Sequence, residues 1–369
     1  MTPDGPGSSS DRSISIALVG DVFISRDNFG QDGSCGEPFL EVVDLLRSTD
    51  ITFGNFEIPL SDRGYPADKF ITIRASPDRA LDVKRMGLDV VSLANNHIMD
   101  YGPDGLLDTI AALDREGVHH VGAGATLEDA MRLTILEVAG RRVGILAWTT
   151  ILPPGATATD MRPGVAPIAI HTGYEVIVRL LEAPSAPPVI TWVDPAAEER
   201  AVEVLTRARK RVDYLLVSVH WGADFGDELA DYERPLGRSL IRAGADLVIG
   251  NHPHTVRGVE VYHGKPIIYG TGLFVDQVPR ENAPPDVLAL YERLSPDSCV
   301  VLVEIGPQGA VRLRLIPTTN EGTGLPRLAH SEIFDRIANR LVRLSAQLGT
   351  TLHFTGEEIT AQLAAIPFS

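Results

Sequence analysis

Short apolar runs alternate with amphipathic segments along most of the chain. The apolar runs are rich in β-branched residues and predict buried strands at 14–22, 50–58, 89–94, 141–149, 214–222, 245–254 and 265–274. The amphipathic segments predict helices at 38–49, 76–87, 102–117, 196–212 and 234–244. Strands that are apolar on both faces need cover on both sides, so the alternation predicts an α/β fold with buried sheets.

The last third of the chain has a different pattern. Two apolar runs at 298–306 and 311–317 predict a hairpin of strands, and a helix is predicted at 331–350. Stretches rich in Pro, Gly and Ala predict loops at 152–170, near a site or as a lid, and at 182–190. We expect a disordered tail at 1–13, a single domain at 14–325 and a helical extension packed on it at 326–369.

The composition narrows the range of partners. The chain has 369 residues, of which 44% are hydrophobic, and 49 acidic side chains against 33 basic ones leave a net charge of −16. Nucleic acid and anionic membrane surfaces require a basic footprint, so neither is expected as the main partner. An anionic substrate would need local cations, either Arg side chains or metal ions.

The two cysteines and the N-terminal segment bear on the cellular compartment. Cys35 and Cys299 build neither a disulfide framework nor a four-thiolate zinc site. The first residues lack the apolar core of a signal peptide, and no run of 18 apolar residues follows. We therefore expect a soluble cytoplasmic protein without a membrane segment; the sequence leaves its oligomeric state open.

Acid–base and metal-binding side chains stand where the predicted strands end. In open α/β sheets ligands bind beyond the carboxyl ends of strands. Each side chain has an ordinary alternative, such as a turn cap, a solvated acid or a packed imidazole. Together, two carboxylates, one Asn and three His form a mixed nitrogen and oxygen donor set that suits zinc, manganese or iron. The set comprises Asp21, Glu57, Asn96, His220, His252 and His254, with His97 beside it.

His252 and His254 flank a proline. Pro253 restricts the backbone, and alternate residues of an extended segment project to the same side. We therefore expect an extended segment that presents both imidazoles to one metal pair.

The motifs around these residues resemble the CapA family of capsule and poly-γ-glutamate biosynthesis proteins, whose domain is similar to calcineurin-like metallophosphoesterases. The matching motifs are VGDVFISR, NFEIPL, VVSLANNHIMDYG, GAGATLEDA, VSVHWG and GADLVIGNHPHTVRGVEVYHGKPIIYGTG, between residue 14 and about residue 275. The resemblance implies a metallophosphoesterase-like layered α/β sandwich, in which two mixed β-sheets are flanked by helices.

The resemblance also implies a role for each ligand. Asp21 and His254 would hold a first metal ion, and Glu57 would bridge it to a second. The second ion would be completed by Asn96, His220 and His252. The cofactor is then one or two divalent ions of manganese, zinc or iron.

Further residues are expected to handle protons and substrate. The resemblance makes His97 a general acid near the leaving group, with Asp100 as a candidate to orient it. Asn95 is expected to shape the turn and to contribute to substrate binding.

Four further side chains complete the predicted site. Arg26 and Arg74 are candidate anion clamps, Arg26 also with a catalytic part, and the alternative for both is an ordinary surface ion pair. Trp221 and Tyr269 are expected to flank the substrate pocket, although residues of this type more often serve in packing.

The chain departs from the metallophosphoesterase pattern at four positions. Phe23 stands where a second imidazole ligand is usual, a trait shared with CapA-like sequences, and Glu57 replaces a shorter bridging Asp. Asn251 replaces the first His of a His-His-Pro-His block, and Leu273 stands where Asn is expected. The first change removes a ligand from one metal site, and the last could alter substrate contacts.

Three functions are compatible with these residues. The first is a metal-dependent hydrolase that acts on a phosphoester or a γ-glutamyl-type amide in an anionic small molecule or a polyglutamate-like polymer. The second is a non-hydrolytic accessory protein of poly-γ-glutamate or capsule synthesis that binds polymer or partner proteins. The third is a vestigial site kept for structure. The nearly complete ligand and acid–base set favours the hydrolase.

Overall fold

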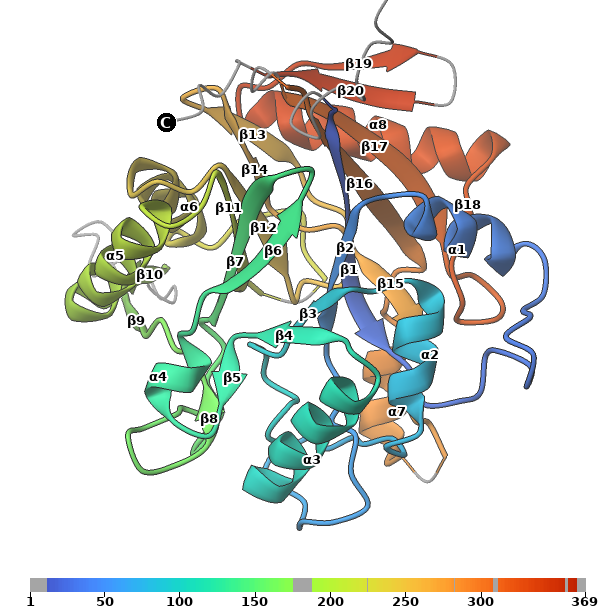
Figure 1. The fold of residues 1–369 in the computed structure, drawn as a ribbon, viewed down its shortest axis with the longest axis vertical. Coiled ribbons are helices and arrows are strands. Elements are labelled where there is room, and N and C mark those ends of the chain that lie inside the picture. The colour runs from blue at the N-terminus through green and yellow to red at the C-terminus, as the bar shows by residue number, and fades with distance from the viewer. Residues whose placement is uncertain are drawn as a thin grey trace, which may run out of the picture.

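The protein folds into four layers, with two β-sheets packed face to face between outer helices (Figure 1). The computed structural model describes residues 12–174, 188–223, 225–281, 283–307, 311–355 and 358–363. This architecture confirms the predicted layered α/β sandwich.

The first sheet has ten strands, and its central strands carry half of the candidate site. Its order is β19-β20-β17-β16-β1-β2-β3-β4, with β15 also beside β1 and β18 beside β17. The strands β1 to β4 run parallel to one another, whereas β16, β17 and β20 are antiparallel to their neighbours. The bounds are β1 (Ile14–Phe23), β2 (Ile51–Phe56), β3 (Val90–Ser92), β4 (His119–Val121), β15 (Leu273–Asp276), β16 (Asp297–Ile305), β17 (Val311–Thr319), β18 (Arg327–Leu328), β19 (Leu352–Thr355) and β20 (Glu358–Gln362).

The second sheet has six strands in the order β13-β14-β12-β11-β7-β6. They are β6 (Thr134–Val138), β7 (Arg141–Thr149), β11 (Tyr214–His220), β12 (Leu247–Asn251), β13 (Val259–Tyr262) and β14 (Lys265–Ile268). Two small two-stranded sheets pair β5 (Ala123–Gly124) with β8 (Gly164–Val165), and β9 (Ile170–Tyr174) with β10 (Val189–Val193).

The helices cover the outer faces of both sheets, except for the last one, which packs against the core between the sheets. They are α1 (Phe39–Arg47), α2 (Arg79–Met86), α3 (Gly102–Arg115), α4 (Leu127–Ala130), α5 (Pro195–Arg209), α6 (Glu233–Arg242), α7 (Pro285–Tyr291) and α8 (Ser331–Gln347). Helices α1, α2 and α3 pack on the ten-stranded sheet, and α5 and α6 pack on the six-stranded sheet (Figure 1). Among the described residues, no helix combines the length and apolar character needed to cross a membrane.

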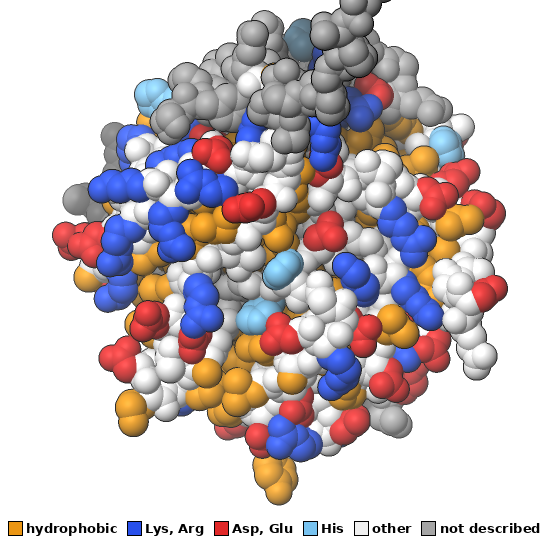
Figure 2. Space-filling model, viewed as in Figure 1, with side chains coloured by type: hydrophobic (Ala, Val, Ile, Leu, Met, Phe, Trp, Pro, Cys, Tyr) orange, Lys and Arg blue, Asp and Glu red, His pale blue; other side chains and the backbone are white. Residues whose placement is uncertain are grey.

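Both faces of β1 are apolar because alternate side chains point into two different cores. Ile16 and Leu18 point into the core between the sheets, while Ala17 and Val19 point into the core beneath the helices. Burial of each large aliphatic side chain contributes about 1.5–3 kcal/mol. On the face shown in Figure 2, basic and acidic side chains are interspersed.

Each strand and helix predicted from the sequence has a counterpart, with some differences at the ends. The run 265–274 is two strands rather than one, β14 and β15, because the chain turns between them through Gly270 and Gly272, the latter with φ 85°. The loop at 152–170 carries the two-residue strand β8 and ends at the start of β9. Most of the predicted loop at 182–190 lies outside the described residues, and its end enters β10.

The two ends of the chain add to these elements. After α8, the C-terminal region forms the hairpin β19–β20, which extends the ten-stranded sheet through β17, so it is not helical alone. The predicted tail at 1–13 lies outside the described residues except for Arg12 and Ser13, and Arg12 pairs with Asp50. The division into domains stays a prediction.

Candidate metal centre

The predicted ligands meet where the carboxyl ends of the two sheets lie against each other. The ten-stranded sheet contributes Asp21 from β1, Glu57 after β2 and Asn96 after β3. The six-stranded sheet contributes His220 at the end of β11, with His252 and His254 after β12. Because β11 and β12 are parallel and in register, His220 lies directly beside Asn251, one residue before the His-Pro-His segment.

Asp21 owes its position to an irregularity in β1. The register of β1 with β2 shifts between Leu18 and Asp21, and an irregularity of this kind re-aims the side chains around it. Gly20 permits it, because a Cβ at this position would lie 2.0 Å from the Gly272 carbonyl oxygen. The Asp21 amide then donates to that oxygen at 3.2 Å, and its carboxylate is buried with 1% exposure.

The backbone of the His-Pro-His segment differs from the extended conformation expected. His252 has φ 95° and His254 has φ 52°, both in the left-handed region. Such conformations cost about 1–3 kcal/mol each in residues other than glycine and often occur at functional sites. The turn lets the His252 amide face Asp21 at 3.2 Å, while the His254 Nδ1 lies 3.0 Å from the same carboxylate.

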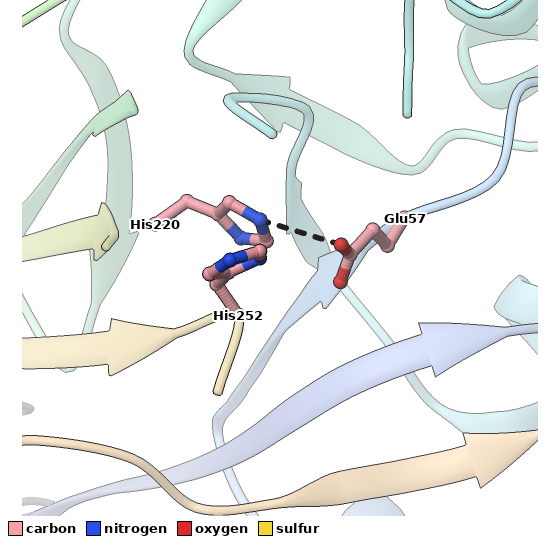
Figure 3. Close-up of side chains that lie close together, drawn as sticks. All are labelled: Glu57, His220 and His252. Carbon is pink, nitrogen blue, oxygen red and sulfur yellow. Dashed lines mark ion pairs between the residues drawn. The ribbon is translucent and has the colours of Figure 1, made fainter. Parts of the chain in front are cut away.

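Two groups of candidate donor atoms share one carboxylate. Glu57, His220 and His252 form one group, and Asp21, Glu57 and His254 form the other, with the donor atoms of each group within 4.8 Å of one another. Figure 3 shows both imidazoles of the first group turned toward Glu57, with His220 Nε2 3.3 Å from Glu57 Oε1. Asn96 Oδ1 lies 2.7 Å from the same nitrogen. Glu57 is therefore common to the two groups.

The protonation states within this cluster fit divalent metal ions. Burial lowers the pKa of His220 to about 3 and lowers that of His252 well below its ordinary value. Burial alone would raise the pKa of Asp21, but hydrogen bonds from His254 and Asn55, with nearby charges, shift it downward. Neutral imidazoles and ionised carboxylates are the forms that bind metals. A cation among buried carboxylates offsets part of the cost of their desolvation.

Asn55 is part of the centre but was missed in the sequence. Its Nδ2 donates to Asp21 Oδ1 at 2.8 Å and to Glu57 Oε2 at 3.1 Å, and lies 3.3 Å from His220 Nδ1. In the parallel pairing of β1 and β2 it is the direct partner of Asp21. The available signal was its spacing of two residues from Glu57, which puts both side chains on one side of an extended strand.

Replacing Asn55 by alanine is expected to weaken metal binding about 10- to 100-fold, the usual effect of removing a residue that orients ligands. Both carboxylates would remain at the site but lose the amide that fixes their rotamers. Metal titration calorimetry measures this change, with Asn28→Ala as the control because Asn28 bonds to Arg26 and Gln277 outside the cluster. Equal affinities in Asn55→Ala and the wild type would contradict the orienting role.

Asn95 forms the turn that leads from β3 to Asn96 and His97. Its Oδ1 accepts from the His97 and Ile98 amides at 3.2 and 2.9 Å, and its Nδ2 donates to the Phe56 carbonyl at 2.8 Å. The side chain is fully buried, so its hydrogen bonds serve the turn. The expected contribution to substrate binding has no counterpart in this placement.

His97 stands beside the ligands in a hydrogen-bonded chain with Asp100 and Lys69. His97 Nδ1 lies 2.8 Å from Asp100 Oδ2, as the orienting role of Asp100 requires. The Lys69 ammonium donates to Asp100 Oδ1 at 2.5 Å and to the Asn96 carbonyl at 2.8 Å. Burial lowers the pKa of His97, although Asp100 opposes the shift. Lys69 lies in a polar loop and carries no motif, so the sequence offered no signal for it.

A cavity of about 310 Å³ opens next to His97, His252 and His254. Four of the predicted substrate contacts do not line it. Arg26 is exposed and lines a neighbouring pocket, and Arg74 is exposed and lies over the Tyr101 ring at 4.4 Å. Trp221 and Tyr269 stack on each other with ring centroids 5.5 Å apart. Both are fully buried in the core between α6 and the six-stranded sheet, so they serve in packing.

The positions that depart from the metallophosphoesterase pattern have separate environments. Phe23 lines the cavity and meets the His97 and His254 rings edge-on, with centroids 6.0 and 5.7 Å away. Asn251 is buried and donates to Ser218 Oγ at 2.9 Å. Leu273 is fully buried in the core, where it pairs with Asp21 through the backbone.

The chain is similar in sequence to several known proteins. One relative, "PGA biosynthesis protein CapA" of Bacillus subtilis, is 31% identical over 271 residues, which cover 72% of this chain and 64% of that protein. Another, a "Probable polyglutamine synthesis accessory protein" of Mycobacterium tuberculosis, is 35% identical over 246 residues, or 65% of this chain and 59% of that protein. The chain thus spans less than two thirds of the length of these relatives.

A solved structure and a family description complete the comparisons. A hypothetical protein from Thermus thermophilus aligns over 85% of this chain and 96% of its own, with a TM-score of 0.40 and 17% identity. The family described as "Bacterial capsule synthesis protein PGA_cap" matches residues 15–278, which include every candidate ligand. The chain therefore belongs to the PGA_cap family of bacterial capsule synthesis proteins.

Proposed function

We propose that the protein is a metal-dependent hydrolase that acts on a phosphoester or a γ-glutamyl-type amide. The observation that carries the proposal is the position of Glu57, whose carboxylate belongs to both candidate donor groups. One carboxylate shared by two adjacent sets of nitrogen and oxygen donors is the arrangement of a two-metal hydrolytic centre. The relatives named for poly-γ-glutamate and capsule synthesis support a substrate or partner related to polyglutamate.

The residues divide the work of hydrolysis between two ends of the site. Asp21, Glu57, Asn96 and the three imidazoles would hold divalent ions of zinc, manganese or iron. When bound, such ions polarise a phosphoryl or carbonyl oxygen and lower the pKa of water. A water oxygen adds to phosphorus or carbon and releases a proton to solvent, and the bond to the leaving oxygen or nitrogen breaks with its electron pair on that atom.

His97 supplies the proton that the leaving atom takes up. Its Nδ1 faces Asp100, so its Nε2 is the nitrogen available for proton transfer. Lys69 neutralises Asp100 on the other side, and this ion pair holds the orienting carboxylate in place.

The alternative is an accessory protein that binds polymer or partner proteins without turnover. The name of the mycobacterial relative, an accessory protein, supports it. The two functions differ in what they demand of the cluster: hydrolysis requires bound metal, whereas polymer binding does not.

Metal content measured on untagged protein, purified without chelators, tests the hydrolase. We expect between one and two equivalents of manganese, iron or zinc per chain, together with turnover of a generic phosphodiester or a γ-glutamyl amide. Less than about a tenth of an equivalent, with no rescue by added metal, would favour the accessory protein instead.

A further inference from the structure

The cavity beside the candidate metal centre is lined mainly by apolar side chains. They come from five separate segments: β1, the loop between β2 and α2, the loop after β11, the loop after β15, and α7 with the turn that follows it. Phe23, Ile71, Ile73, Phe225, Leu290 and Leu294 are among them. Side chains brought together from five segments indicate a built surface rather than a chance contact.

The cavity lacks the charges that a polyanion needs. Among the described residues that line it, Lys69 is the one Lys or Arg, and its ammonium is engaged by Asp100 and by the Asn96 carbonyl. The arginines expected as anion clamps lie elsewhere, Arg26 at a neighbouring pocket and Arg74 over Tyr101. Two more arginines lie outside the lining, Arg293 over the Phe225 ring and Arg280 over the Tyr291 ring. A carboxylate or phosphate on this side would lose its hydration without finding a free cation among the described lining residues.

The loop that carries Phe225 is held in place by a buried arginine. Arg257, with 1% side-chain exposure, donates to the carbonyls of Ala223 and Gly226 at 2.8 and 3.1 Å and pairs with Glu233 at 3.0 Å. The Phe225 amide donates to the Pro253 carbonyl within the His-Pro-His segment. We call the apolar residues that line the cavity the apolar wall. Through Phe225 this wall is hydrogen-bonded to the backbone that positions His252 and His254.

The position of His97 tells which part of a substrate enters the cavity. His97 lines it together with the candidate ligands Asn96, His252 and His254, and the Phe23 ring packs edge-on against His97 and His254. The scissile bond must lie between the metal ligands and His97, so the group that His97 protonates extends into the apolar space. The acidic part of the substrate stays on the side of the ligands.

We propose that the substrate of this site carries a compact apolar leaving group, an aromatic or branched aliphatic amine or alcohol, rather than a further glutamate or a sugar phosphate. The inference rests on the hydrolase proposed above. A volume of about 310 Å³ is at the lower end for small-molecule sites and suits one ring or branched chain.

Two pairs of compounds test this preference. The members of each pair share the γ-glutamyl or phosphoryl group and differ only in the leaving group. The amide pair is γ-glutamyl benzylamide and γ-glutamylglycine, and the ester pair is benzyl phosphate and phosphoglycolate. With the metal-loaded full chain, we expect kcat/KM to be about 10-fold or more higher for the benzyl member of the pair that is hydrolysed, because burial of a phenyl group favours its transition state. Which pair reacts distinguishes an amide substrate from a phosphoester.

A variant of the apolar wall provides the matched comparison. Leu290→Asp should bring the ratio of benzyl to carboxylate compound close to one, whereas Leu288→Asp should leave it unchanged. Leu288 lies on the same helix, is 37% exposed and does not line the cavity. Binding of all four compounds is measured by calorimetry in parallel.

The outcomes separate the two proposals. Hydrolysis without a preference for the benzyl compounds would overturn the apolar leaving group and leave the hydrolase standing. Tighter binding of the benzyl compounds without any turnover would support the assignment of the cavity and count against the hydrolase. Equal, weak binding and no turnover would overturn both.

Discussion

Replacement of His97 by alanine is expected to lower turnover about 100- to 10,000-fold, which is the range for loss of a general acid or base. His97 is not in either candidate donor group, so metal content should stay at the wild-type level. The fold should persist as well, because Asp100 keeps the Lys69 ammonium at 2.5 Å and the Ile73 amide at 2.8 Å as partners. A loss confined to the rate is the specific signature of proton transfer.

The measurement compares kcat and metal content in wild type, His97→Ala and His119→Ala. His119 is an exposed histidine on β4 and serves as the control for loss of an imidazole. Asp100→Asn, which keeps the shape but removes the charge beside Nδ1, should give a smaller loss in kcat than His97→Ala. Unchanged turnover in His97→Ala would remove His97 from the mechanism.

Replacement of Glu57 by alanine should weaken metal binding at both ion sites at once. Removing a residue that merely supports ligands costs about 10- to 100-fold in affinity, so loss of a shared ligand should exceed about 100-fold at each site. Glu57 belongs to both donor groups, whereas His254 belongs to one. His254→Ala is therefore expected to empty one site and to leave the second largely occupied.

Elemental analysis of both variants after dialysis against one concentration of metal measures this difference. Glu57→Gln is the matched control for shape, since it retains an oxygen ligand and the partner of Asn55 Nδ2. A Glu57→Ala protein that loses only one ion, or none, would contradict the bridging position. A His254→Ala protein that loses both would show that the two sites do not fill independently.

Much of this architecture could be predicted from local patterns. A strand buried on both faces leaves a continuous apolar run in the sequence, and β1, β7 and β11 show such runs. The convergence of the candidate ligands was also foreseeable, because parallel strands such as β11 and β12 end at one edge of a sheet. The alternation of the hairpin β19–β20 is weaker, and its pairing with β17 joins segments far apart in the sequence.

Other features of the site depend on contacts that local patterns do not record. Asn55 becomes a central donor only because β2 pairs with β1 in a register that sets it beside Asp21. Lys69 reaches Asp100 from a loop whose path is set by packing. Arg26 and Arg74 are candidate anion clamps in the sequence. In the structure Arg26 lines a neighbouring pocket and Arg74 lies over the Tyr101 ring, so neither lines the cavity.

The amino-acid sequence alone predicts the alternation of strands and helices, the chemistry of the candidate ligands and the strand ends on which they stand. These follow from side-chain type and from periodicities of two and 3.6 residues, which are local properties. Three features become visible only in the three-dimensional fold. Glu57 is common to two donor groups, His252 and His254 have left-handed backbone, and apolar side chains line the cavity beside His97. Each of these features depends on how the two sheets and α7 pack against one another. That packing is made of contacts between residues that are distant in the chain.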